Sequence, residues 1–61
     1  MRVYLVKDDE GAYLCIDHKG MVYWATIIAW AYPFYTESVA LTYAQKYDGY
    51  LVRATITIRE D

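Results

Sequence analysis

The sequence contains one cysteine, Cys15, one histidine, His18, and no asparagine. A single cysteine cannot close a disulfide within the chain, and one cysteine and one histidine cannot supply the ligand set of a zinc site. The absence of asparagine excludes N-glycosylation. A lone reduced cysteine fits a reducing compartment. We therefore expect a cytoplasmic protein with no metal and no cofactor.

Neither sign of charge is in large excess, and no hydrophobic run is long. Six Lys and Arg residues stand against eight Asp and Glu residues, so the net charge is −2. This balance argues against a net-basic nucleic-acid binder and against a strongly acidic imitation of DNA. The longest apolar run, from Met21 to Phe34, is shorter than the ~18 residues of a membrane helix, and the N-terminus lacks a secretory pattern. We expect no membrane association.

Glycine and proline are few, whereas apolar residues are plentiful. The 61 residues include three Gly and one Pro, and 57% of them are hydrophobic. This composition excludes a disordered tail and a low-complexity chain. The length allows a single domain, residues 1–61, which needs very good packing or a partner chain to be stable.

Four segments have the pattern of β-strands, namely 2–7, 12–17, 21–24 and 50–59. Turns at 7–11 and 18–20 separate the first three, which favours hairpin connections. The last segment is the clearest, because apolar and polar residues alternate along it. Its buried face is predicted to consist of Val52, Ala54, Ile56 and Ile58.

A helix is predicted to begin at Glu37, with Thr36 as its N-cap, and to end before Asp48. Gly49 is placed for a left-handed C-cap. Helical spacing predicts a buried stripe made of Val39, Ala40, Tyr43, Ala44 and Tyr47. The preceding segment, 25–35, fits either a strand or a helical turn.

These elements predict an α+β fold in which a small, antiparallel-rich sheet of three to four strands carries one helix on one face. The proline at position 33 favours an edge or irregular segment over a central strand there. The helix is expected to pack on one apolar set of sheet residues, Leu14, Ile16, Val52, Ala54 and Ile56.

Aromatic residues make up 18% of the chain and are concentrated in the middle of it. Alternation along an extended segment would place Trp30, Tyr32 and Phe34 on one side. An outward set would form a protein-binding patch or a dimer seam, because Tyr and Trp dominate interface hot spots. The alternative is an overfilled core from which Tyr hydroxyls reach water. The candidate binding residues are Tyr23, Trp24, Trp30, Tyr32 and Tyr35.

The acidic turn formed by Asp8, Asp9 and Glu10 is a second candidate. It lacks the ligand spacing of a calcium-binding loop. It is either a solvated hairpin tip or a charged rim that contacts a basic groove on a partner, where it would speed association.

No catalytic arrangement can be assembled from this sequence. Asp17 and His18 are adjacent, so on a regular strand they point to opposite faces, and Cys15 also lies opposite His18. We interpret His18 as a turn residue and Cys15 as a small packing residue. We expect no enzymatic activity.

The layout resembles small bacteriophage-encoded proteins that carry Tyr-Leu in a hairpin, then a Trp, then A-x-x-F-x-T-x-x-x-A before a helix, and finally Gly and a closing strand. The matching positions are Tyr13-Leu14, Trp24, the stretch 31–36, Ala40 and the stretch 49–52. The resemblance implies a phage or prophage origin. Some such proteins block host defences such as CRISPR effectors by binding a protein component.

The sequence therefore predicts a non-enzymatic protein-binding module, a phage-encoded inhibitor or modulator that acts stoichiometrically on a host protein in the cytoplasm of an infected or lysogenic bacterium. The alternative is a self-assembling phage accessory protein that forms a homodimer through its aromatic patch. A third class, a single-strand nucleic-acid binder, would stack bases on the aromatic side chains. The few, scattered positive charges disfavour this class, although Arg53 and Arg59 share the polar face of the last strand.

Overall fold

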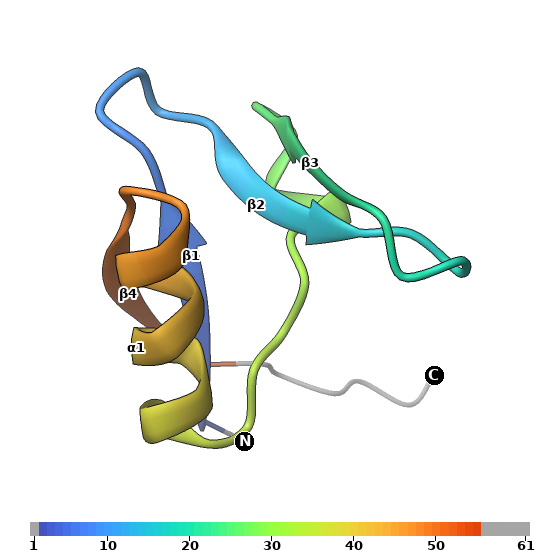
Figure 1. Ribbon diagram of the computed structural model, residues 1–61. Helices are drawn as coiled ribbons and strands as arrows, with labels where there is room; N and C mark the ends of the chain where they lie inside the picture. Colours follow the sequence, from blue (N-terminus) through green and yellow to red (C-terminus); the bar gives the residue numbers. More distant parts are fainter. Residues whose placement is uncertain (1, 56–61) are drawn as a thin grey trace, which may run out of the picture.

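The computed structural model describes residues 2–55 and confirms the α+β architecture (Figure 1). Four antiparallel strands form one sheet in the order β3-β2-β1-β4, and one helix contacts β1 and β4. The elements in chain order are β1 (Arg2–Lys7), β2 (Tyr13–Ile16), β3 (Val22–Ala25), the short 3-10 helix η1 (Ile28–Trp30), α1 (Glu37–Lys46) and β4 (Tyr50–Thr55). The predicted continuation of the last strand, 56–59, lies outside the described residues.

The two hairpin loops have the same structure. In each, an aspartate side chain, from Asp8 or Asp17, accepts hydrogen bonds from the backbone N–H groups two and four residues later. The glycine three residues after each aspartate has a positive φ, 86° at Gly11 and 82° at Gly20. The spacing Asp-x-x-Gly therefore encodes both turns, because the carboxylate satisfies the loop N–H groups and glycine takes the left-handed conformation.

The sheet is open between its two middle strands. β1 and β2 are paired only where Lys7 lies opposite Tyr13. The segment 32–34 enters the gap, since the Tyr32 N–H donates to the Leu14 carbonyl of β2 over 3.1 Å, whereas Phe34 pairs with Tyr4 of β1. Pro33 sits between them and has no N–H to satisfy. The ambiguous segment 25–35 thus contains the helical turn η1 and an irregular stretch, as its proline indicated, and only residues 32–34 lie inside the sheet.

The core lies between α1 and one face of the sheet, and this face differs from the predicted one. The helix does pack over Leu14 and Ile16, but on β4 its partner is Leu51. Val52 and Ala54 pair with Leu5 and Val3 and therefore lie on the opposite face. The prediction was wrong because alternation identifies residues that share a face but not which face the helix covers. Ile56, also predicted to contact the helix, is outside the described residues.

The second face of the sheet is also covered in part. Val3, Leu5 and Cys15 are buried there although α1 lies on the other side. The segment that carries η1 passes over this face, and Ile28 and Pro33 line a hollow together with Val3 and Leu5. β1 is therefore covered on both sides.

The stripe of buried side chains on α1 is narrower than the sequence predicts. Only Ala40 and Ala44 are fully buried, and Val39 is 46% exposed. Two alanines let the helix approach the sheet closely, so Val39, one position away from Ala40, turns outward. Thr36 occupies the predicted N-cap position but its side chain makes no capping hydrogen bond.

The C-terminal cap of the helix uses a different residue from the predicted one. Asp48, not Gly49, has the left-handed conformation, with φ of 58°. The Gly49 N–H donates to the Ala44 carbonyl over 2.8 Å, which completes a Schellman-type end. Gly49 is required for a steric reason, because a Cβ there would lie 2.7 Å from Val6 Cγ1.

Candidate functional site

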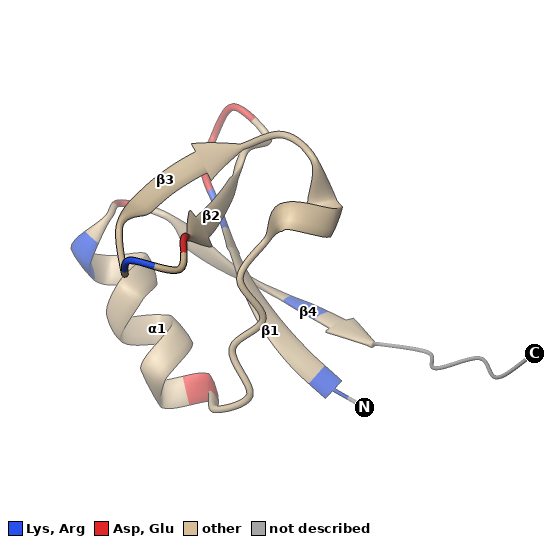
Figure 2. Ribbon diagram, turned by 90° about the vertical axis from the view of Figure 1, so that its right-hand side faces the viewer, with Lys and Arg blue, Asp and Glu red and all other residues tan. Residues whose placement is uncertain are grey.

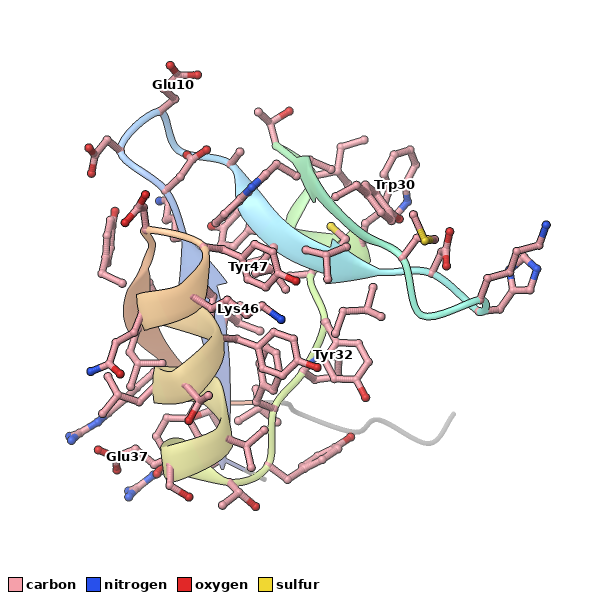
Figure 3. The ribbon with its side chains drawn as sticks, in the orientation of Figure 1. Glu10, Trp30, Tyr32, Glu37, Lys46 and Tyr47 are labelled. Atoms are coloured by element: carbon pink, nitrogen blue, oxygen red, sulfur yellow. The ribbon has the colours of Figure 1, made fainter. Side chains whose placement is uncertain are left out.

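The predicted aromatic residues do not form one patch, and the structure divides them among separate places (Figure 3). Trp30 is 58% exposed on η1, whereas Phe34 is 4% exposed in the core. The expected alternation of Trp30, Tyr32 and Phe34 on one side is therefore wrong. The 3-10 turn at Ile28–Trp30 breaks the extended conformation that the alternation assumed.

A group of exposed apolar side chains lies around η1. We call it the η1 surface; it comprises Tyr23, Ile27, Ile28 and Trp30, each more than two-fifths exposed. Tyr23 belongs to it because it pairs with Cys15, on the sheet face that the η1 segment covers. A hollow of about 330 Å³ between this segment and the sheet is lined by Val3, Leu5 and Ala54, among others. The η1 surface thus adjoins an apolar groove.

Sequence reasoning missed the two isoleucines of this surface. Ile27 and Ile28 lie in the segment whose periodicity fitted two conformations, and isoleucine is usually a core residue. Their exposure follows from the tight turn at η1, which contributes no buried residue. No local sequence signal distinguishes this outcome from burial.

Tyr32 belongs to a second aromatic group, on the helix side of the sheet. Its ring meets that of Phe34 edge-on at 4.9 Å, and Phe34 in turn lies 5.0 Å from Tyr43. Tyr43 stacks on Tyr47 at 6.1 Å. This row of rings packs along α1, and Tyr32, which is 40% exposed, lies at its outer end. Tyr35, just before α1, is 63% exposed and lines a hollow of about 230 Å³ with Tyr32 and Tyr43.

Trp24 is half-buried and belongs to a third place, near the acidic turn. A shallow hollow of about 280 Å³ is lined by Trp24, Tyr47 and acidic residues from two loops, namely Asp8, Asp9, Glu10 and Asp48. Asp8 is committed to its own turn, since its Oδ1 accepts two backbone hydrogen bonds. Asp9 and Glu10 are exposed. Asp48, which the sequence analysis did not include, joins them because the helix end folds back beside this loop.

The side chains of Cys15 and His18 are not arranged for catalysis. Cys15 is fully buried, its thiol donates to the Tyr13 carbonyl over 3.3 Å, and burial raises the pKa of the thiol above its ordinary value of 9.0. A neutral buried thiol is a poor nucleophile. His18 is exposed in the second hairpin loop. Across residues 2–55, no three His, Cys, Asp or Glu side chains are grouped to hold a metal ion.

Two of the positive charges lie over tyrosine rings. The Lys7 ammonium is 5.2 Å from the centre of the Tyr13 ring, and the Lys46 ammonium is 5.5 Å from that of Tyr47. These contacts are typical cation–π pairs. Within the described chain, no helix is long and apolar enough to cross a membrane.

No protein-family model, no curated protein and no solved structure matches this chain.

Proposed function

We propose that this chain is a non-enzymatic protein-binding module whose main contact is the η1 surface. The observation that carries the proposal is the exposure of Ile28 and Trp30, at 60% and 58%, beside Ile27 and Tyr23. Monomeric proteins rarely leave large apolar side chains grouped on the surface unless they contact another molecule. A tryptophan flanked by aliphatic side chains is the composition of an interface hot spot.

The binding is stoichiometric rather than catalytic. A partner that covers the η1 surface would bury Trp30 and could extend a side chain into the apolar groove beside it, between Ile28 and Leu5. The exposed carboxylates of Asp9 and Glu10 lie on another loop and supply a charged contact. Such charges speed association more than they deepen affinity. The resemblance to small phage proteins makes a bacterial host protein the expected partner and inhibition the expected effect.

The test is a pull-down from nuclease-treated bacterial lysate with tagged wild-type chain, Trp30→Ala and Leu41→Ala. Leu41 is the matched control because it is a similarly exposed apolar residue on α1, away from η1. We expect one protein to be captured in a stoichiometric amount by the wild type and by Leu41→Ala, and to be lost with Trp30→Ala. Circular dichroism should show all three chains folded. Capture that persists in Trp30→Ala would overturn the role of the η1 surface.

A further inference from the structure

The outer edge of β4 is an unpaired strand edge within residues 2–55. Tyr4 exchanges its backbone hydrogen bonds with Phe34, on the side away from β4. In an antiparallel ladder the bonding direction alternates along a strand, so β1 bonds to β4 through Val3 and Leu5 and their partners Ala54 and Val52. The N–H and C=O groups of Leu51 and Arg53 therefore point outward, and no described residue pairs with them.

An exposed strand edge of this kind is a template for another strand. Proteins that remain monomeric protect such edges with bulges, prolines or inward-pointing charges. β4 runs over six residues without proline, and its described pairing with β1 shows continuous register with no bulge. The opposite edge strand, β3, has only four residues and no charged side chain. β4 is therefore the longer of the two edges, and it carries one charged side chain, Arg53.

Charge is distributed unevenly along β4. The acidic loop 8–10 and Asp48 lie at the end where β4 begins, and Arg2 and Arg53 lie toward the end where it stops (Figure 2). Lys7 and Lys46 neutralise part of the negative charge at the acidic end. Glu37, at the start of α1, neutralises part of the positive charge at the basic end. Among residues 2–55, four acids against two lysines still leave a negative end, and two arginines against one glutamate leave a positive end.

We infer that β4 is a dimerisation edge whose occupant is β4 of a second copy, paired antiparallel about a two-fold axis. In this arrangement the negative end of each copy meets the positive end of the other, whereas parallel pairing would bring like ends together. A two-fold contact is also self-complementary and closes at two chains. The product is an eight-stranded sheet, because each copy contributes its four strands.

The outward-pointing N–H and C=O groups of Leu51 and Arg53 determine the register between the two β4 strands of the dimer. Placing the axis at Val52 sets Leu51 of each copy opposite Arg53 of the other, so each of these pairs exchanges both backbone hydrogen bonds. It also avoids Arg53 opposite Arg53, which like charges would disfavour. On the sheet face that carries Val3 and Leu5, Val52 of one copy lies opposite Val52 of the other. On the same face, Tyr50 of each copy lies opposite Ala54 of the other. Because the two copies share sheet faces, both η1 surfaces lie on the same side, and the dimer presents two of them.

The decisive variant is chosen from the direction of the backbone hydrogen bonds of β4. Arg53→Pro removes an N–H that points outward and leaves the ladder to β1 intact, and edge strands accept proline at such positions. Val52→Pro is the matched control, because it removes an N–H that bonds to Leu5 and so should unfold the chain. Sedimentation equilibrium of the whole chain over a wide concentration range measures the mass, and circular dichroism reports folding.

We expect the wild type to reach twice its 7.2 kDa chain mass at high concentration and to dissociate on dilution, and folded Arg53→Pro to stay at 7.2 kDa. Hydrogen exchange provides a readout that needs no variant, since the amides of Leu51 and Arg53 should be protected only in the dimer. A mass of 7.2 kDa at every concentration would overturn the inference, as would a dimer in which these two amides exchange as fast as loop amides. A dimer lost in Trp30→Ala but kept in Arg53→Pro would assign the seam to the η1 surface. A monomer that still captures its partner through Trp30 would leave the proposed function standing.

Discussion

Phe34 and Tyr4 exchange both of their backbone hydrogen bonds, with N···O distances of 2.7 and 2.9 Å. This bridge inserts the segment before α1 between β1 and β2 and carries the Phe34 ring into the core beside Tyr43. The residue next in sequence, Tyr35, is left exposed. One short pairing thus decides which aromatic side chains hold the fold together and which remain on its surface.

Phe34→Ala should therefore cost about 3–5 kcal/mol of unfolding free energy, as for other buried phenylalanines, which is enough to unfold a domain of this size. Phe34→Leu keeps most of the volume and should cost less than about 1.5 kcal/mol. Tyr35→Ala is the surface control, with a change within about 0.5 kcal/mol. Urea denaturation measures all three, and a Phe34→Ala chain as stable as Tyr35→Ala would contradict the burial of Phe34.

Removing the Asp17 carboxylate should destabilise the second hairpin loop. The Lys19 and Met21 N–H groups donate to its Oδ1 over 2.8 and 2.9 Å. Asp17→Ala should cost about 1–2 kcal/mol, because these are charge-assisted bonds in a site open to water. Asp17→Asn keeps an accepting oxygen and should lose less. Thermal denaturation compares them, with Asp9→Ala as control, and equal losses for Asn and Ala would show that the accepting oxygen is not the cause.

Gly49→Ala should be more damaging than Gly11→Ala, although only Gly11 has a positive φ. A Cβ at Gly49 would lie 2.7 Å from Val6 Cγ1 and 3.0 Å from the Lys7 carbonyl oxygen. Such overpacking typically costs about 1–3 kcal/mol, and the backbone atom cannot move without disturbing β1. A Cβ at Gly11 would meet no other atom. The only penalty for alanine there is the left-handed backbone conformation, which costs about 1–2 kcal/mol. Parallel denaturation curves decide the order, and the reverse order would contradict the close approach of β1.

The Cys15 thiol should be unreactive in the folded chain. Burial raises its pKa, opposed in part by hydrogen bonding with Tyr23 and the Ala25 backbone. At pH 8 we expect slow labelling by a thiol reagent in buffer and fast labelling in denaturant. Because the folded pKa is the higher one, the thiol's contribution to stability is complete below pH 9.0 and is lost as the pH rises above it. In Cys15→Ala, the loss of stability above pH 9.0 that this thiol causes should be absent. Rapid labelling of the native wild-type chain would contradict the burial of the thiol.

The fold class and the order of elements could be read from the sequence because each rests on a local pattern. Alternation in β4, the turn glycines at positions 11 and 20, and the helical spacing of Ala40 and Ala44 all depend on neighbours a few residues away. The candidate site was less predictable. Tyr23 and Trp30 were identified and are exposed together on one side of the sheet, but Trp24 and Tyr32 pack elsewhere.

The sequence by itself determined which residues form strands and helix, where the turns lie and which side chains share a face, since these follow from backbone periodicity and turn chemistry. Only the tertiary structure decided that α1 covers the Leu51 face rather than the Val52 face, and that residues 32–34 enter the sheet while η1 turns Trp30 outward. These outcomes depend on register and on contacts between segments far apart in the chain, and a period of two or 3.6 residues is the same whichever neighbour covers the apolar side.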